Sequence, residues 1–372
     1  MINHLENIKG ICTKTGLIKS LRRFYKSTPE AMASNYTVHE TTPSTFVIQP
    51  NCQDAEYQGF VQHFRDLEKH VYKREKVPAK HCVDNLWLIK PAAMNQGRGI
   101  EIFKNDLAGM KKFIESKQQN SYWVVQKYIE RPLLYNGRKF DIRMWAVMTW
   151  KGELFYYRYG YVRTSSDFYS LDSKLNYVHL TNNCLQQFGD KYGTFEEGNT
   201  LPLCVLDQYI KKAYPKYDVD VDKHIIPRIK DLMIDSFLSV KDELNPSKRR
   251  NCFELLGYDF LIDEDFRVWL IEVNTNPYLG LPNKFIDGLL PKMLNDLCEI
   301  VLDPYVKSAN PLPKHEVENQ FELLYDEKKK VNQRRSYAES VYPLHDLEPP
   351  DNETVPVFSH PSRLTRRSRS CL

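Results

Sequence analysis

Two oxygen-bearing side chains stand two residues apart in an apolar run of the sequence. Glu272 and Asn274 lie in the stretch WLIEVNTNP, which begins at Trp269 and otherwise reads as a buried strand. Side chains at positions i and i+2 of a strand leave the same face, so the carboxylate and the amide would point to one side. Asp259, in the strand expected to pair with this one, adds a second carboxylate. Two carboxylates and an amide oxygen suit a hard cation such as Mg²⁺.

The same residues would also fit a hairpin with polar side chains on a solvent-exposed face. The flanking residues argue against this, because Leu270, Ile271 and Val273 are large and apolar and the strand should therefore be well covered. A buried carboxylate without a partner is costly and rarely occurs. The sequence favours the magnesium site over the exposed hairpin.

A magnesium site of this kind usually serves a nucleotide, so phosphate-binding groups are expected nearby. Lys90 ends the predicted strand WLIKP, and the loop NQGRGI follows with Gly97, Arg98 and Gly99. Glycines let the backbone approach phosphate closely, and lysine supplies a point charge. A lone Gly-X-Gly is more often a plain turn, but a strand, a lysine and a glycine loop in succession each have a phosphate-binding role.

Two further stretches offer groups for a base and a ribose. Residues 126–129 end the strand YWVVQKYI, where backbone groups could pair with a purine edge. Lys139, Asp141 and Arg143 alternate along the next strand and should share one side of it. Asp141 could accept from a ribose hydroxyl, and the two cations could face phosphate. A cross-strand salt-bridge ladder on a solvated sheet face explains the alternation equally well.

The remaining polar candidates stand near predicted strand or loop ends. Arg163 lies in GYVRTSSDFY, and Thr181 and Asn182 lie in HLTNN. His179, in the same HLTNN motif, is expected to be structural rather than catalytic, and it is given no metal role.

The elements that must position these residues alternate between strands and helices. Residues 86–91 and 122–129 read as strands around a helix that Asn105 or Asp106 can cap. FDIRMWAVMTW and ELFYYRYGYV form a hairpin through Lys151 and Gly152, and FELLGYDFLID pairs with VWLIEVN. Helices are expected over residues 223–240 and about 284–301. Adjacent antiparallel hairpins with helices indicate an α+β fold, with a ligand cleft between the two sets.

Composition limits the class of protein. A chain of 372 residues is too long for one ordinary core and suggests two or three domains. No apolar run is long enough to span a membrane, and the N-terminus lacks the apolar core of a signal peptide, so we expect an intracellular protein. The eight cysteines form no Cys-X-X-Cys pair, which argues against a zinc or disulfide framework. The net charge of +4 is mild.

The two ends of the chain differ from its centre. Residues 1–81 contain a basic helix (GLIKSLRRFYK), a Thr/Pro-rich connector and a second helix (YQGFVQHFRDLEKHVYKRE), which we interpret as an abbreviated N-terminal domain. Few apolar residues recur at a regular period in 306–372, so that tail is expected to be mostly disordered, with one short helix near residues 321–330. The central region divides into subdomains at 82–165 and 166–305.

The order of these motifs resembles the tubulin tyrosine ligase-like family. The resemblance rests on WLIKPAAMNQGRGI, VVQKYIERPLLYNGRKFDIR, YRYGYVRTSS, HLTNN, FELLGYDFLID and WLIEVNTNP. It covers residues 82–280 strongly and 10–80 weakly. It implies an ATP-grasp fold, in which two α+β subdomains enclose a nucleotide cleft, and it implies ATP and Mg²⁺ as cofactors.

The resemblance also implies roles for single residues. Arg143 and Arg163 would serve the transferred phosphate and the amino-acid substrate. The magnesium ligands would be Asp259, Glu272 and Asn274. The residues that match ATP-binding positions are Lys14, Lys90, Arg98, Gly99, Gln126, Lys127, Tyr128, Ile129, Lys139, Asp141, Thr181 and Asn182.

The implied activity is a ligation to the C-terminal tail of tubulin. ATP would convert a carboxylate into an acyl phosphate, which the α-amine of a free amino acid then attacks. Glutamate is favoured on family frequency, with tyrosine close behind, and HLTNN argues mildly against glycine. The implied location is the cytoplasm and cytoskeleton, including the cilium or basal body, with neither nucleic acid nor membrane as a partner. A protein kinase is discounted, because no HRD…N or DFG motif appears. A microtubule-binding pseudoenzyme and a ligase with a non-tubulin acceptor stay open.

Overall fold

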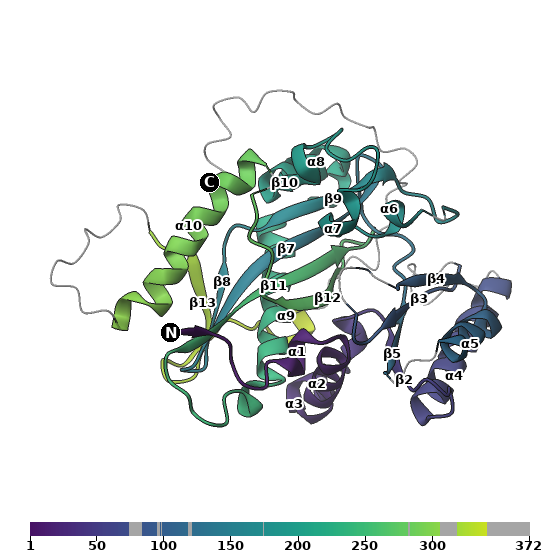
Figure 1. The fold of residues 1–372 in the computed structure, drawn as a ribbon, viewed down its shortest axis with the longest axis horizontal. Coiled ribbons are helices and arrows are strands. Elements are labelled where there is room, and N and C mark those ends of the chain that lie inside the picture. The colour runs from purple at the N-terminus through teal and green to yellow at the C-terminus, as the bar shows by residue number, and fades with distance from the viewer. Residues whose placement is uncertain are drawn as a thin grey trace.

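Two β-sheets, each covered by helices, form the framework of the protein (Figure 1). The computed structural model describes residues 1–73, 84–94, 97, 99–117, 121–173, 175–281, 283–305 and 318–340. Within these residues the fold is a mixture of helices and sheets, which confirms the predicted α+β class.

The smaller sheet has four strands in the order β2-β5-β3-β4. These strands are β2 (Thr45–Ile48), β5 (Trp123–Lys127), β3 (Leu86–Pro91) and β4 (Glu101–Lys104). Helices α4 (Ala55–Lys73) and α5 (Leu107–Ser116) cover one face, where Phe60, Trp87 and Ile114 form an apolar core. Asp106 caps α5 by accepting a hydrogen bond of 2.8 Å from the Gly109 amide, as one of the two predicted caps.

The larger sheet is mostly antiparallel and follows the order β1-β11-β7-β8-β13-β14, with β12 beside β11 and with β9 and β6 beside β7. Its strands are β1 (Ile2–Asn3), β6 (Leu134–Tyr135), β7 (Arg138–Thr149), β8 (Glu153–Tyr157), β9 (Tyr161–Phe168), β10 (Thr200–Pro202), β11 (Cys252–Ile262), β12 (Val268–Thr275), β13 (Phe321–Asp326) and β14 (Val331–Asn332). Gly152 turns the β7–β8 hairpin at a φ of 79°, as expected for the predicted Lys151-Gly152 turn.

Helices lie on both faces of the larger sheet, and the alternation of β7 shows why. Met144 and Met148 pack with α9 (Ile226–Leu238) in one core, whereas Trp145 and Val147 pack with α10 (Lys284–Val301) in the other. The first core also contains α2 (Lys14–Ser27) and α8 (Leu203–Ala213). The short helices are α1 (Lys9–Cys12), α3 (Pro29–Ala33), α6 (Asn176–His179), α7 (Asn183–Gln186) and α11 (Tyr337–Ser340).

The predicted short helix near residues 321–330 is wrong. Residues 321–326 form strand β13, which pairs with β8, where we expected a short helix. Phe321 packs on Tyr157 with ring centroids 4.8 Å apart, and Leu324 is fully buried. The edge of β8 that does not face β7 supplies backbone partners for β13. No local pattern in the sequence reveals this pairing. The rest of the predicted tail, 306–317 and 341–372, lies outside the described residues.

The predicted domains at 1–81, 82–165 and 166–305 stay a prediction, and the two sheets draw on interleaved parts of the chain. Residues 1–81 contribute to both halves, because α2 packs against the larger sheet while β2 and α4 belong to the smaller one. Strands β7 and β8, which fall within 82–165, join the larger sheet.

Candidate active site

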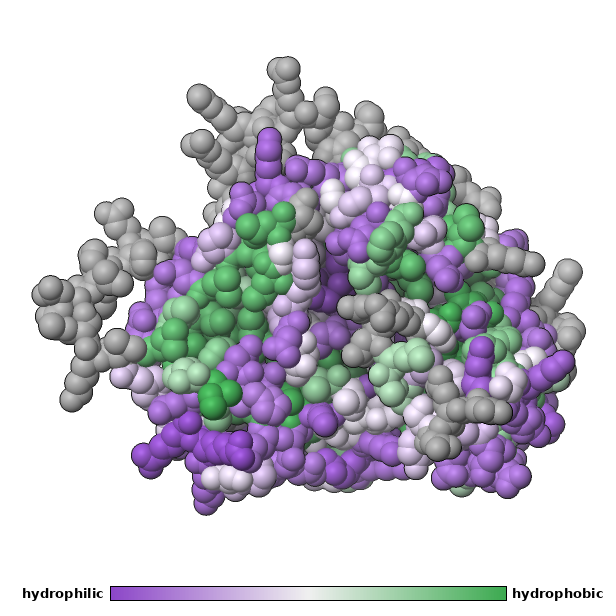
Figure 2. All heavy atoms as spheres, viewed as in Figure 1, coloured by the Kyte–Doolittle hydropathy of each residue, from purple (hydrophilic) through white to green (hydrophobic). Residues whose placement is uncertain are grey.

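A pocket opens between the smaller sheet and the strands β7, β11 and β12 of the larger one, and most predicted site residues line it. Hydrophilic residues surround a hollow near the middle of the face shown in Figure 2. The predicted residues in its lining are Lys14, Lys90, Gln126, Lys127, Tyr128, Ile129, Lys139, Asp141, Arg163, Thr181, Asn182, Asp259, Glu272 and Asn274.

Two of the described site residues do not line the pocket, and a third predicted residue is not described. Arg98 is outside the described residues. Gly99 does not line the pocket, although Gly97 does, and both glycines have a positive φ. Arg143 stands just behind the pocket wall, where it is bonded to Asp259.

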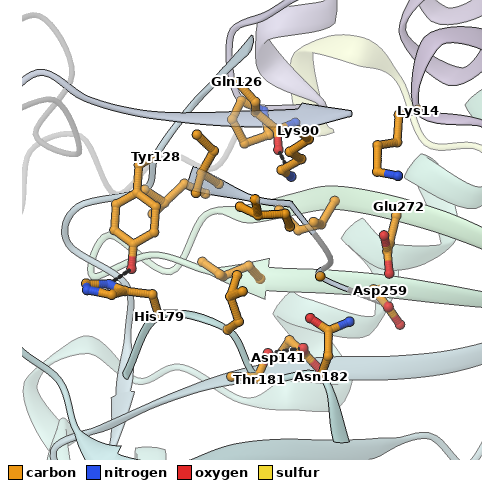
Figure 3. Close-up of a pocket in the computed structure, with 18 of the residues that line it drawn as sticks. Lys14, Lys90, Gln126, Tyr128, Asp141, His179, Thr181, Asn182, Asp259 and Glu272 are labelled. Atoms are coloured by element: carbon orange, nitrogen blue, oxygen red, sulfur yellow. Dashed lines mark hydrogen bonds between the residues drawn. The ribbon is translucent and has the colours of Figure 1, made fainter. Parts of the chain in front are cut away.

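The three proposed metal ligands lie within hydrogen-bonding reach of one another, and Figure 3 shows Asp259 beside Glu272. Asp259 of β11 pairs in register with Glu272 of β12, next to a β-bulge. The Asn274 amide donates to Glu272 Oε1 at 3.1 Å and to Asp259 Oδ2 at 3.4 Å. Burial and the neighbouring charge of Asp259 raise the pKa of Glu272. The two carboxylates therefore repel one another when both are ionised.

This donor set fits Mg²⁺. Two carboxylates and an amide are hard oxygen ligands, and Mg²⁺ takes few protein ligands because it keeps waters or phosphate oxygens. Asn274 currently presents its NH₂ group to the carboxylates, but a flip of the amide would present its oxygen instead. Among the described residues no group of three or more His, Cys, Asp or Glu side chains could hold a metal. The candidate set, Asp259, Glu272 and Asn274, contains only two such side chains and takes its third ligand from an amide.

Two arginines contact Asp259, and one of them, Arg163, also joins it to Asp141. Arg143 Nη2 donates to Asp259 Oδ2 at 2.9 Å, and Arg163 Nη2 lies 2.9 Å from the same oxygen. Arg163 Nε also donates to Asp141 Oδ1 at 2.6 Å. Burial disfavours the charge of Asp259, yet Arg143 and Arg163 hold its pKa well below the usual range.

The structure excludes one interpretation of the strand on which Lys139, Asp141 and Arg143 alternate, namely the solvated salt-bridge ladder. Lys139, Asp141 and Arg143 are all buried, so they do not form a ladder on a solvated sheet face. Asp141 accepts from Arg163 and from the Thr181 hydroxyl. Each of its oxygens still has a second lone pair that a ribose hydroxyl can use.

Three lysines with lowered pKa values line the pocket. Lys90 Nζ donates to Gln126 Oε1 at 2.6 Å, and burial lowers the pKa of Lys90 to about 8. Burial likewise lowers the pKa of Lys139 to about 7. Lys14 donates to the carbonyl oxygen of Met94, and burial lowers its pKa as well. Buried lysines with lowered pKa values gain strongly from an anionic ligand.

Lys127 differs from the other lysines of the pocket. Its ammonium forms a buried ion pair with Glu130 and donates to the Leu86 carbonyl oxygen at 2.8 Å. Its side chain therefore stabilises the smaller sheet. Only the backbone around Lys127 is left to contact a base.

The sequence reasoning missed the apolar wall of the pocket. Its residues are Leu88, Ile100, Leu180, Leu261 and Ile271. A flat, apolar slot is what a purine ring requires, whereas the polar residues named above suit a triphosphate. The sequence offered one signal for this wall: Leu180 stands between His179 and Thr181 in the HLTNN motif. His179 was expected to be structural, yet it also lines the pocket.

Comparison with known proteins decides the family. The family model described as "Tubulin-tyrosine ligase family" matches residues 1–310. The chain belongs to the tubulin-tyrosine ligase family. This match confirms the resemblance inferred from the motifs, and it extends through the N-terminal helices that resembled the family only weakly.

Relatives in this family include enzymes that modify tubulin. A region of 265 residues, 68% of the chain, is 36% identical to tubulin glycylase 3C of Tetrahymena thermophila. A region of 252 residues is 36% identical to tubulin glycylase 3A of Drosophila melanogaster. A longer region of 363 residues, 90% of the chain, is 29% identical to the probable alpha-tubulin polyglutamylase Ttll1 of Tetrahymena thermophila.

The extent of these matches differs between the two kinds of relative. The matched regions span 24% of each of the two glycylases but 81% of the polyglutamylase. Among the described residues, no helix is both long enough and apolar enough to cross a membrane.

Proposed function

We propose that this member of the tubulin-tyrosine ligase family is an ATP-dependent carboxylate–amine ligase that adds an amino acid to the C-terminal tail of tubulin. The observation that carries the proposal is the meeting of Lys90, Asp259, Glu272 and Asn274 in one pocket between two sheets. This is the arrangement that a magnesium-bound triphosphate requires. We also propose the ATP-grasp arrangement for the two sheets, with the nucleotide between them.

Each wall of the pocket has a part in holding ATP. The base would lie against the apolar wall near Leu88 and Ile271, beside the backbone of residues 126–129. The phosphates would lie near Lys90 and Lys139, where buried ammonium groups stabilise negative charge. Asp259, Glu272 and Asn274 would hold Mg²⁺, which supplies further charge neutralisation.

The reaction would proceed in two balanced steps. A carboxylate oxygen of the acceptor attacks the γ-phosphorus, so that an acyl phosphate forms and ADP leaves. The α-amine of a free amino acid then attacks the acyl carbon, an amide bond forms, and phosphate leaves with loss of one proton from the nitrogen. Arg143 and Arg163 would stabilise the negative charge that accumulates in both steps, and both contact Asp259. The chemistry needs positioning and charge rather than a protein nucleophile.

We propose glutamate as the amino acid that is added. The polyglutamylase relative supports this, because its match extends over 90% of this chain and 81% of its own length. Glycine is the second candidate, since the glycylase relatives are more nearly identical over the region that they match. Tyrosine stays a third possibility from the sequence motifs. The cytoskeleton, including the cilium, is the location that suits this substrate.

Incorporation of labelled amino acids into purified tubulin tests the proposal. The wild-type chain should incorporate glutamate in an ATP-dependent manner, with glycine and tyrosine tested separately. Glu272→Gln removes one charge from the metal site and should lower the rate at least a hundredfold, about 2.7 kcal/mol of transition-state stabilisation. Glu115→Gln makes the same change on the exposed surface of α5 and should have no effect.

Three outcomes would contradict parts of this proposal. Microtubule binding without incorporation of any amino acid would indicate a pseudoenzyme. Incorporation into another acceptor, with none into tubulin, would refute the substrate but not the chemistry. Equal activity of Glu272→Gln and Glu115→Gln would refute the metal site.

A further inference from the structure

Through its ring, His179 connects α6 to Ser173 and to Tyr128 beside the pocket. The ring is buried at the end of α6, where Nε2 lies 2.8 Å from the Ser173 carbonyl oxygen and Nδ1 lies 2.9 Å from the Tyr128 hydroxyl. A carbonyl oxygen only accepts, so Nε2 carries the ring hydrogen and Nδ1 accepts from Tyr128. Burial lowers the pKa of His179, which keeps the ring neutral near pH 7.

The Tyr128 hydroxyl passes this constraint on to Lys139. Because its hydrogen is donated to His179, its oxygen is left to accept from Lys139 Nζ at 3.0 Å. Lys139 Nζ also donates to the backbone carbonyl oxygen of His179 at 3.0 Å. An ammonium has three N–H groups, so these two bonds direct the third toward the pocket that Lys139 lines. Figure 3 shows Tyr128 and His179 joined at one side of the pocket.

We propose that His179 is a positioning residue for ATP: its Nδ1 orients the Tyr128 hydroxyl, which in turn fixes the Lys139 ammonium where it meets the phosphates. The inference rests on the proposed function, because it assigns the ligand of Lys139 as a nucleotide phosphate. Without the acceptor at Nδ1, the Tyr128 hydrogen is free to turn toward the neighbouring Tyr169 hydroxyl, and the Tyr128 oxygen no longer holds a fixed orientation for Lys139.

Two amide substitutions at His179 distinguish the role of Nδ1 from that of Nε2. The Asn oxygen occupies the place of Nδ1, so His179→Asn keeps an acceptor for Tyr128 but loses the contact to Ser173. The Gln amide reaches the place of Nε2, so His179→Gln keeps the contact to Ser173 but loses the acceptor. Both replacements are neutral and polar, which makes each the matched control of the other.

We expect His179→Gln to raise the KM for ATP about tenfold with a smaller change in kcat, because a fixed lysine binds phosphate in ground and transition states alike. The KM of His179→Asn for ATP should stay within about threefold of the wild-type value. Tyr128→Phe removes the bridging hydroxyl itself. It should raise the KM for ATP by about as much as His179→Gln. The double variant of Tyr128→Phe and His179→Gln should be no worse than either single variant, since both break the same connection.

A merely structural histidine predicts a different pattern. Equal KM values for the Asn and Gln variants, or a larger increase for Asn, would overturn the positioning role. Additive effects of Tyr128→Phe and His179→Gln would overturn it as well. The absence of ATP binding by the wild-type chain would instead refute the proposed function, and this inference would fall with it.

Discussion

At the scale of single residues, Lys139 combines a position in the pocket lining with a pKa near neutrality. Burial lowers the pKa of Lys139 to about 7, while Asp141 raises it and Lys90 lowers it. At pH 8 the free protein therefore holds Lys139 mainly as the neutral amine. A phosphate placed beside it favours the ammonium and raises its pKa.

ATP binding at pH 8 should therefore be accompanied by the uptake of protons. Calorimetric titrations in two buffers with different enthalpies of ionisation measure this uptake directly. Lys139→Met removes the titrating group and should reduce the number of protons taken up while it weakens binding. Identical binding heats for the wild-type protein in both buffers would contradict a phosphate site at Lys139.

Strand alternation alone was enough to bring the main polar groups of the site together. Glu272 and Asn274 share a face of β12 because their positions differ by two, and Asp259 lies directly opposite Glu272 on the paired strand β11. The bonds of Arg163 to both Asp141 and Asp259 could not be predicted in the same way. They depend on the register of three neighbouring strands, which the local sequence does not specify.

At the scale of elements, the segment that follows β14 packs against α9 and pairs with its buried carboxylates. Asp231 and Asp235 of α9 are fully buried, and two arginines that follow β14 neutralise them. Arg334 donates to both oxygens of Asp235 at 3.0 and 2.9 Å and lies 3.7 Å from the centre of the Tyr337 ring. The helix therefore depends on residues that lie a hundred positions away.

Arg334→Ala should destabilise the protein strongly, because it leaves the Asp235 carboxylate buried without its cation. Breaking such a pair typically costs about 3–5 kcal/mol, and denaturant unfolding measures the loss. Arg335→Ala should cost less, since the Arg335 side chain is 34% exposed. A second change, Asp235→Asn, should recover part of the loss in the Arg334→Ala background. Failure of that rescue would show that packing, rather than charge, holds the segment in place.

Helices with a clear apolar face, such as α5, α9 and α10, were predictable from periodicity and caps. The strand β13 was not, because its stability comes from the edge of β8 rather than from its own pattern.

At the scale of the whole molecule, the candidate site joins two separately packed sheets. Lys90 and Gln126 come from the smaller sheet, whereas Lys139, Asp259 and Glu272 come from the larger one. Their apolar cores are distinct, so a ligand between them adds contacts that neither half has alone.

Magnesium and ATP together should raise the thermal unfolding temperature, because a ligand that binds only the folded state stabilises it. At a ligand concentration one hundred times Kd the gain is about 2.7 kcal/mol. ATP with a chelator, or Glu272→Gln with ATP and magnesium, should give a much smaller shift. A shift of the same size with and without magnesium would contradict the assigned metal ligands.

The family model ends at residue 310, whereas β13 begins at Phe321. A fragment cut at the family limit would lose the partner of β8 and both arginines that neutralise α9. Its uncovered strand edge would then be a template on which other copies could add strands, so the shortened protein should aggregate where the full chain stays dispersed.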